Sequence, residues 1–212
     1  MKKSNLLFFL FLNAVSFSFG VELWNGFTTD MTIEQITERV SELFVINRTY
    51  HREHTERYGT SIGYHYNSGP YDSYIAFHTN NPASPAITFY FKNNNLYIIQ
   101  VCWGSDFQTL LTRHRSQFGN PFETKSSNSY PFSGSYTVTN NDYKWQNAGR
   151  YIFLTAKIYP TNYPPSSMDP VFSYFINRGI YDAWQAEINM EQRQREEAEQ
   201  QRRRAASEGI TF

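Results

Sequence analysis

The only cluster of histidine and acidic residues in the sequence lies at residues 51–56. His51, Glu53, His54 and Glu56 place two imidazoles three residues apart among carboxylates, and zinc accepts both kinds of ligand. The spacing does not form a His-Glu-x-x-His motif, and no third ligand follows at a fixed offset. A solvated polar loop accounts for the same residues, so we predict no metal site here.

Two further side chains could act as a nucleophile or a base. Cys102 lies in an apolar run at residues 98–103, which favours a packed thiol over a reactive one. His114 shares a helical face with Phe and Leu residues, which predicts a buried or hydrogen-bonded imidazole. Neither a Gly-x-Ser-x-Gly motif, a phosphate-binding loop nor a dinucleotide fingerprint occurs. We therefore predict that the protein binds no cofactor and is not an enzyme; an enzyme of unknown class is the second alternative.

Aromatic residues make up 18% of the chain and include 16 tyrosines. Tyr64, Tyr66, Tyr71, Tyr74 and Tyr90 lie close together in the sequence. Alternation along strands would turn some of them outward as a stacking surface for sugars or peptides. Packing within a half-buried sheet is the interpretation we favour, because aromatic residues are good strand formers.

Two short helices should support these side chains. Thr32 and Gln35 have the spacing of a capping box, and apolar residues then recur at helical spacing up to Phe44. The second helix starts at Ser105 or Asp106 and ends at Gly119, where a left-handed cap is expected.

The strand signals surround these helices. We expect strands at residues 21–24, 61–66, 71–78, 86–91, 96–103, 151–158 and within 135–146. Residues 86–103 form the clearest hairpin, with a tight turn at 92–95. Residues 47–58 are polar and are predicted to be a loop or a ragged helix end, and residues 120–133 are predicted to be a loop.

These elements predict a single α+β domain at residues 21–160. A largely antiparallel sheet of five to seven strands would carry the two helices on one face. Each helix follows a short strand that ends in tryptophan and precedes antiparallel strands, which suggests a duplicated unit.

The C-terminal part differs in kind from the domain. A linker at 161–169 leads to a predicted helix at 170–212, whose apolar face ends near Met190. Residues 191–206 form a charged arm supported by ion pairs at i,i+4 spacing. Arg202, Arg203 and Arg204 at its far end could contact a protein partner or acidic lipid, although a solvated face is the default.

Residues 1–20 are predicted to be a cleavable signal peptide. Lysines precede an apolar run at 6–12, and small residues occupy the −3 and −1 positions for cleavage after Gly20 or Ser16. The apolar run is too interrupted for a membrane anchor, so we expect an exported protein, periplasmic or extracellular, with no transmembrane segment in the mature chain. Removal of 1–20 leaves a net charge of −2, which argues against nucleic-acid binding.

Short motifs resemble those of the BamE/SmpA-type outer-membrane assembly proteins. Asp30-Met31-Thr32 with Ile36 is similar to their Gly-Met-Thr … Val helix start, and residues 117–121 followed by 143–145 resemble their Leu-Gly-x-Pro … Trp-x-Tyr stretch. More broadly, residues 24–154 resemble exported bacterial proteins of uncharacterised function. The family's lipid-bearing cysteine is missing, the two motif halves sit on different helices, and Asp30 replaces the glycine. The resemblance implies an α+β fold and no catalytic residues.

Together these observations predict an exported, non-enzymatic cell-envelope protein that acts through protein–protein contacts. The alternative is a glycan- or peptide-binding module, for which the contact residues would be exposed tyrosines. The candidate contact residues are Tyr64, Tyr66, Tyr71, Tyr74, Arg202, Arg203 and Arg204.

Overall fold

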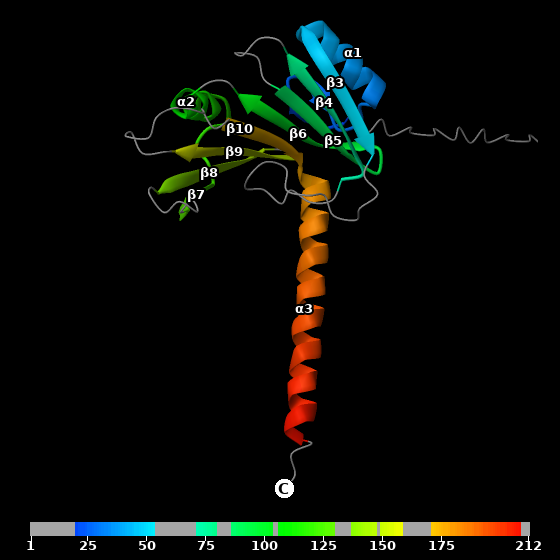
Figure 1. Cartoon of the computed structure of the whole chain (residues 1–212), viewed down its shortest axis with the longest axis vertical. Coiled ribbons are helices and arrows are strands. Elements are labelled where there is room, and N and C mark those ends of the chain that lie inside the picture. The colour runs from blue at the N-terminus through cyan, green and yellow to red at the C-terminus, as the bar shows by residue number, and fades with distance from the viewer. Residues whose placement is uncertain are drawn as a thin grey trace, which may run out of the picture.

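Strands rich in aromatic and β-branched residues build an α+β fold around one large antiparallel sheet (Figure 1). The computed structural model describes residues 20–53, 71–79, 86–103, 106–129, 137–147, 149–158 and 171–208. Within these ranges the eight-stranded sheet is joined by a two-stranded sheet and three helices. The sequence analysis therefore predicted the fold class correctly but too few strands.

The elements follow one another in a simple order. The small sheet pairs β1 (Glu22–Trp24) with β2 (Phe27–Thr28). The large sheet has the order β3-β4-β5-β6-β10-β9-β8-β7, with every neighbouring pair antiparallel. Its strands are β3 (Ile46–Glu53), β4 (Ser73–Thr79), β5 (Ala86–Lys92), β6 (Asn95–Trp103), β7 (Glu123–Ser129), β8 (Val138–Asn147), β9 (Arg150–Ile158) and β10 (Val171–Asn177). The helices are α1 (Ile33–Leu43), α2 (Phe107–Phe118) and α3 (Arg178–Glu208).

The topology repeats itself, as the hypothesis of a duplicated unit predicts. In the first half α1 is followed by the meander β3-β4-β5-β6, and in the second half α2 is followed by β7-β8-β9-β10. The two meanders meet in the middle of the sheet, where β6 pairs with β10. The strand order therefore reads outward from this junction in the same way on both sides.

The two faces of the sheet have different coverings. Ile36 and Val40 of α1 and Leu110 and Leu111 of α2 pack into the same core as Phe175, so both helices lie on one face. The opposite face carries a second cluster, in which Tyr90, Tyr97, Ile98, Phe153, Tyr174 and Ile176 are buried. The first turn of α3 packs on this second cluster, and the helix then runs away from the sheet (Figure 1).

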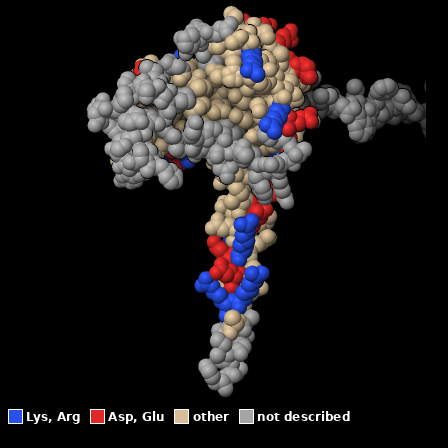
Figure 2. Space-filling model, in the orientation of Figure 1, with Lys and Arg blue, Asp and Glu red and all other residues tan. Residues whose placement is uncertain are grey.

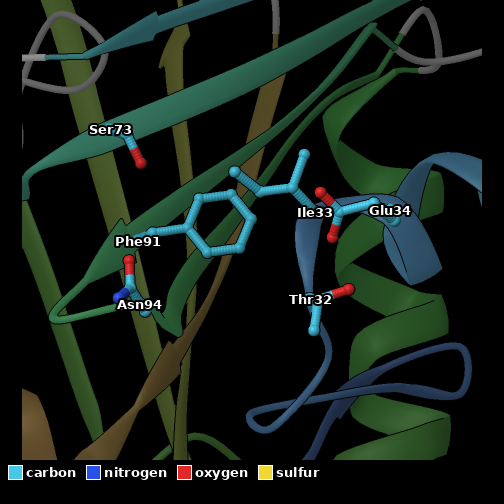
Figure 3. A pocket seen from close by; sticks show the side chains of 6 residues that line it. All are labelled: Thr32, Ile33, Glu34, Ser73, Phe91 and Asn94. Carbon is cyan, nitrogen blue, oxygen red and sulfur yellow. The ribbon is translucent and has the colours of Figure 1, made fainter.

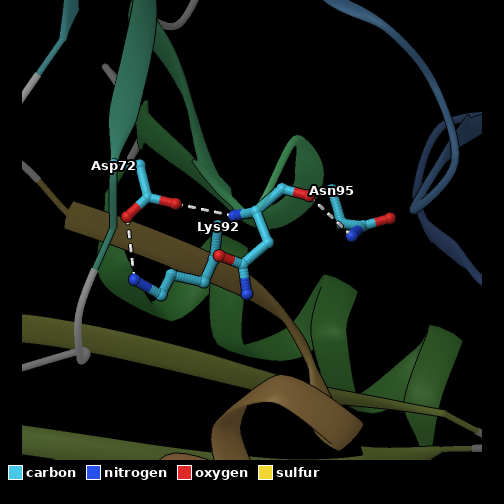
Figure 4. Close-up of polar contacts among 4 residues, drawn as sticks. Asp72, Lys92 and Asn95 are labelled. Carbon is cyan, nitrogen blue, oxygen red and sulfur yellow. Dashed lines mark hydrogen bonds and ion pairs between the residues drawn. The ribbon is translucent and has the colours of Figure 1, made fainter.

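The hairpin turn between β5 and β6 is fixed by side-chain contacts (Figure 4). Asn93 and Asn94 have φ angles of 51° and 59°, the left-handed conformation that a two-residue turn requires. Asp72 accepts a hydrogen bond from the Asn93 backbone N–H at 2.7 Å and pairs with Lys92 Nζ at 2.8 Å. Asn95 Nδ2 donates to the Asn93 carbonyl at 3.0 Å.

The predicted helix ends are confirmed. The side chain of Thr32 accepts from the Gln35 backbone N–H while Gln35 bonds back to Thr32, which completes the capping box of α1. Asp106 caps α2 through the Thr109 N–H at 2.9 Å, and Gly119 ends that helix with a φ of 79°.

Two segments predicted to be loops are edge strands, and those predictions were wrong. Residues 46–53 form β3 and residues 123–129 form β7, within the stretches 47–58 and 120–133. Each pairs with one neighbour only, and its described side chains are mostly exposed, so neither carries a clear apolar alternation. Backbone hydrogen bonds form these strands, and the side chains give little signal for them.

The predicted start of the C-terminal helix at Pro170 was also wrong. Val171–Asn177 is the central strand β10, and α3 begins only at Arg178, where Asn177 Oδ1 accepts from the Ile180 N–H at 3.3 Å. A strand that is buried on both faces has a nearly continuous apolar sequence, which a helical pattern can also fit. The predicted signal peptide, the strand at 61–66 and the linker at 161–169 lie outside the described residues.

Candidate functional site

A cleft of about 400 Å³ opens on the helix-covered face of the sheet, where the two halves of the fold meet. Its lining comes from β1, from the C-terminal end of α1, from α2 and from the central strands β6 and β10. This volume falls in the range of about 300–1,000 Å³ that is typical of ligand pockets. The cleft therefore belongs to neither half alone.

The floor of the cleft is aromatic. It consists of Trp24, Phe44, Trp103, His114 and Phe175. Trp24 stacks on Phe175 with ring centroids 5.6 Å apart, and it meets Trp103 edge to face at 6.3 Å. Phe175 is buried, whereas both tryptophans are partly exposed, so their ring surface is what the cleft offers to a ligand.

A buried chain of hydrogen bonds holds this floor in place. Trp103 Nε1–H donates to Ser173 Oγ at 2.8 Å, and Ser173 Oγ lies 3.1 Å from His114 Nε2. His114 Nδ1 lies 2.9 Å from the Leu110 carbonyl, which can only accept, so Nδ1 carries the proton and Nε2 accepts from the serine hydroxyl. Burial lowers the pKa of His114, which matches a neutral ring.

This chain resembles a serine–histidine pair, yet its geometry is structural. Ser173 has no exposed surface, and its hydroxyl is already bonded on both sides. A nucleophile must reach its substrate, and Ser173 cannot. The structure thus confirms the sequence-based interpretation of His114 as a packed and hydrogen-bonded residue.

The rim of the cleft is polar and exposed. Glu22 lies at the start of β1, Asn25 lies on the β1–β2 turn, and Arg113 and Gln117 lie one helical turn apart on α2. Within the described ranges, the side chains of Asn25, Arg113 and Gln117 make no hydrogen bond or ion pair with the protein. The rim can therefore offer amide, guanidinium and carboxylate groups to a ligand.

The turn that carries Glu22 and Asn25 is anchored. Glu22 Oε1 accepts from the Gly26 N–H at 3.0 Å, and Arg39 Nη2 donates to the Asn25 carbonyl at 3.2 Å. Arg150 on β9 donates to the backbone carbonyls of Glu22 and Leu23, which ties β1 to the sheet. This side of the cleft is therefore already in place before a ligand arrives.

A second hollow, of about 260 Å³, lies beside the N-terminus of α1 (Figure 3). The Phe91 ring and the Ile33 side chain approach each other across it, with Thr32, Glu34, Ser73 and Asn94 around them. The Thr32 hydroxyl is used by the helix cap, and a hydrogen bond from the Glu34 backbone lowers the pKa of the exposed Glu34 carboxyl. Its polar groups thus serve the helix end, and the hollow is smaller than the cleft.

The structure places the candidate tyrosines within the sheet where it describes them. Tyr71 is 4% exposed, Tyr90 is 8% exposed and Tyr74 is half-buried. Tyr71 and Tyr74 lie 5.0 Å and 5.9 Å from the Tyr90 ring, and Tyr90 donates to Gln100 Oε1 at 2.8 Å. Burial raises the pKa of Tyr90. Packing is thus the role of Tyr71 and Tyr90; Tyr64 and Tyr66 lie outside the described residues.

The remaining candidates for chemistry are not brought together. His51 is exposed on β3, and His54 and Glu56 lie outside the described residues. Across the part of the chain that the structure describes, no three potential ligands gather around a metal-sized space. Cys102 is a half-buried free thiol whose pKa is raised by burial, as expected for a packed cysteine.

The charged arm projects as the outer part of α3 (Figure 2). Every side chain from 192 to 204 is exposed, including Arg202, Arg203 and Arg204. Glu191–Arg195 and Glu199–Arg203 form the two expected ion pairs at i,i+4 spacing. Acidic and basic side chains alternate along the arm, and basic ones gather toward its described end (Figure 2).

Comparison with protein-family models, with curated proteins and with solved structures finds no match for this chain. The resemblance to the BamE/SmpA-type proteins therefore stays a prediction. No helix among the described residues is long and apolar enough to cross a lipid bilayer.

Proposed function

We propose that this protein is an exported, non-enzymatic component of the cell envelope and that it acts through protein–protein contacts made by the outer part of α3. One observation carries the proposal: α3 extends to Glu208, although no side chain from 192 to 204 is buried. At 1.5 Å per residue the segment 191–208 reaches about 25 Å beyond the part that packs on the sheet. Such a segment stabilises no core and is well placed to meet a partner.

The charges of the arm indicate the kind of surface it suits. Both signs occur along the arm, where Glu196, Glu197 and Glu199 lie between Arg195 and Arg202. A partner helix or groove that also carries both signs complements this pattern, whereas a polyanion would meet the glutamates as well as the arginines. A protein partner is therefore favoured over nucleic acid.

The hydrogen bonds of Val21 bear on the proposed cleavage after Gly20. Val21 N–H donates to Thr29 Oγ1 at 3.0 Å, and the Val21 carbonyl accepts from the Thr29 N–H at 3.0 Å. Signal cleavage after Gly20 would leave the second of these bonds intact and would place the new ammonium beside the Thr29 hydroxyl. The proposed cleavage site is thus compatible with the fold.

The export proposal is tested by the N-terminus of the protein isolated from the envelope. We expect mass spectrometry to find a chain that starts at Val21, or at Phe17 if cleavage follows Ser16. Recovery of the protein with Met1 retained and in the cytoplasmic fraction would overturn the proposal.

The contact proposal is tested by photo-crosslinking in the native envelope. A benzoylphenylalanine at Gln200, which is exposed on the arm, should give one discrete crosslinked protein. The same group at the exposed Gln108 of α2 is the matched control and should not give that product. Identical products from both positions, or none from Gln200, would remove the arm as the contact element.

A further inference from the structure

We infer that the cleft between α1 and α2 is a binding site for a neutral saccharide. This inference goes beyond the proposed protein contacts and concerns a different surface of the molecule. It starts from the division between an aromatic floor and a polar rim that carries one acidic and one basic side chain, Glu22 and Arg113.

The floor presents mostly aromatic ring surface, and the nitrogen atoms of Trp103 and His114 are engaged within the fold. The Trp103 N–H points inward to Ser173, and both nitrogens of His114 are engaged below the floor. A ligand therefore meets aromatic faces and edges on this side. The face of a pyranose ring that carries C–H groups packs well on such a surface, because the positively polarised hydrogens meet the negative face of the aromatic ring.

The rim supplies the complementary chemistry. Asn25 and Gln117 each offer a donor and an acceptor side by side, Arg113 offers several donors, and Glu22 offers acceptors. Sugar hydroxyls both donate and accept hydrogen bonds, so two adjacent hydroxyls can form bidentate hydrogen bonds with these planar amide and guanidinium groups. No described residue hydrogen-bonds or ion-pairs with the side chains of Asn25, Arg113 and Gln117, which leaves these groups available to a ligand.

The charged side chains of the rim distinguish a neutral saccharide from other flat ligands. A nucleotide also stacks on aromatic rings, but its phosphates need an excess of positive charge. Of the charged side chains that line the cleft, Glu22 is acidic and Arg113 is basic, and the nearby Arg150 is held by the backbone carbonyls of Glu22 and Leu23. A sugar phosphate also needs an excess of positive charge. A cationic ligand would be repelled by Arg113. The ligand that fits is uncharged, with one apolar face and many hydroxyl groups.

The experiment is calorimetric titration of the purified chain with maltose, cellobiose and N,N′-diacetylchitobiose, with glucose 6-phosphate and glucosamine as charged comparisons. We expect at least one neutral disaccharide to bind and to change the tryptophan fluorescence, because two of the four tryptophans line the cleft. Since weak sites are of millimolar affinity, absence of binding by every neutral sugar up to about 10 mM would overturn the inference. Binding of the charged sugars alone would overturn it as well.

Rim variants assign the binding to this cleft without disturbing the core. The double change Arg113→Ala and Gln117→Ala removes two exposed side chains and should weaken binding at least about tenfold. Gln108→Ala, an exposed glutamine on the same helix outside the cleft, is the matched control and should change the affinity less than about twofold. Equal binding by the double variant and the control would place the sugar elsewhere and refute the site.

Discussion

At the scale of single residues, the imidazole of His114 couples the floor of the cleft to the stability of the fold. The folded protein holds this ring neutral and 3% exposed, between the Leu110 carbonyl and Ser173. In the unfolded chain the same ring has an ordinary pKa of about 6.5. Because folding lowers the pKa, the unfolded state binds more protons as the pH falls from about 6.5 toward the lowered pKa of the folded state.

We therefore expect the free energy of unfolding to fall as the pH drops below about 6.5, by at most about 1.4 kcal/mol per pH unit from this residue. The His114→Gln variant should be less stable than the parent at pH 8, and the difference should shrink toward pH 5. Urea titrations over this range measure both effects. If His114→Gln keeps the parent's pH dependence, the neutral buried ring is ruled out. Carboxylates with a lowered pKa, such as Asp72, act only in a more acidic window.

Residue-scale features were predictable where their cause is local. The Thr32–Gln35 capping box and the Gly119 helix end depend on neighbours within a few residues, and the sequence displays them. The cleft depends on Trp24 of β1 meeting Trp103, Arg113 and Gln117, which lie about 80 or more residues later in the chain. The one available signal was that each predicted strand before a helix ends in tryptophan. The two rings meet because β6 pairs with β10 and Trp24 stacks on Phe175 of β10.

At the scale of elements, the β5–β6 turn offers a direct test of backbone conformation. Asn94 has a φ of 59°, which asparagine tolerates, glycine adopts freely and a β-branched residue resists. Asn94→Gly should leave the stability unchanged or raise it slightly, and Asn94→Val should lower it by about 1–2 kcal/mol in chemical denaturation. Asn95→Val is the control and should cost less, since Asn95 already lies in β6 and loses one exposed hydrogen bond. A smaller loss for Asn94→Val than for Asn95→Val would contradict the turn.

The elements differ in how clearly their side-chain patterns predict them. The β5–β6 hairpin is half-buried and rich in aromatic residues, and its prediction is confirmed. The edge strands β3 and β7 are held by backbone hydrogen bonds to β4 and β8. Backbone pairing leaves no pattern in the side chains, so the sequence did not predict these strands. The prediction for β10 was wrong for the opposite reason. Tyr174 and Ile176 are buried and Phe172 is partly buried on one face, while Ser173 and Phe175 are buried on the other. Without alternation, its sequence does not separate a strand from a helix.

At the scale of the whole molecule, β10 closes the fold. It pairs with β6 from the first meander and with β9 from the second, and among the described strands it is the one that joins the two halves of the sheet. Deletion of residues 171–212 exposes both of those strands and removes Ser173, Tyr174, Phe175 and Ile176, which are at most 1% exposed. We expect this truncated chain to lose cooperative thermal unfolding in calorimetry. A sharp transition near that of the parent would show that the halves are stable without β10.

A shorter deletion at the same end should have almost no effect on stability. Removal of residues 191–212 keeps β10 and keeps Trp184, which is 6% exposed and packs against Tyr181. The arm that is lost is fully exposed from 192 to 204 and held by ion pairs worth about 0.2–0.5 kcal/mol each. Because those pairs stabilise the helix alone, the melting temperature of the domain should change by less than about 2 °C. Crosslinking to the envelope partner should be lost in the same variant, whereas saccharide binding in the cleft should persist. A large drop in melting temperature would show that the arm packs on the domain, and a partner-facing arm would then be excluded.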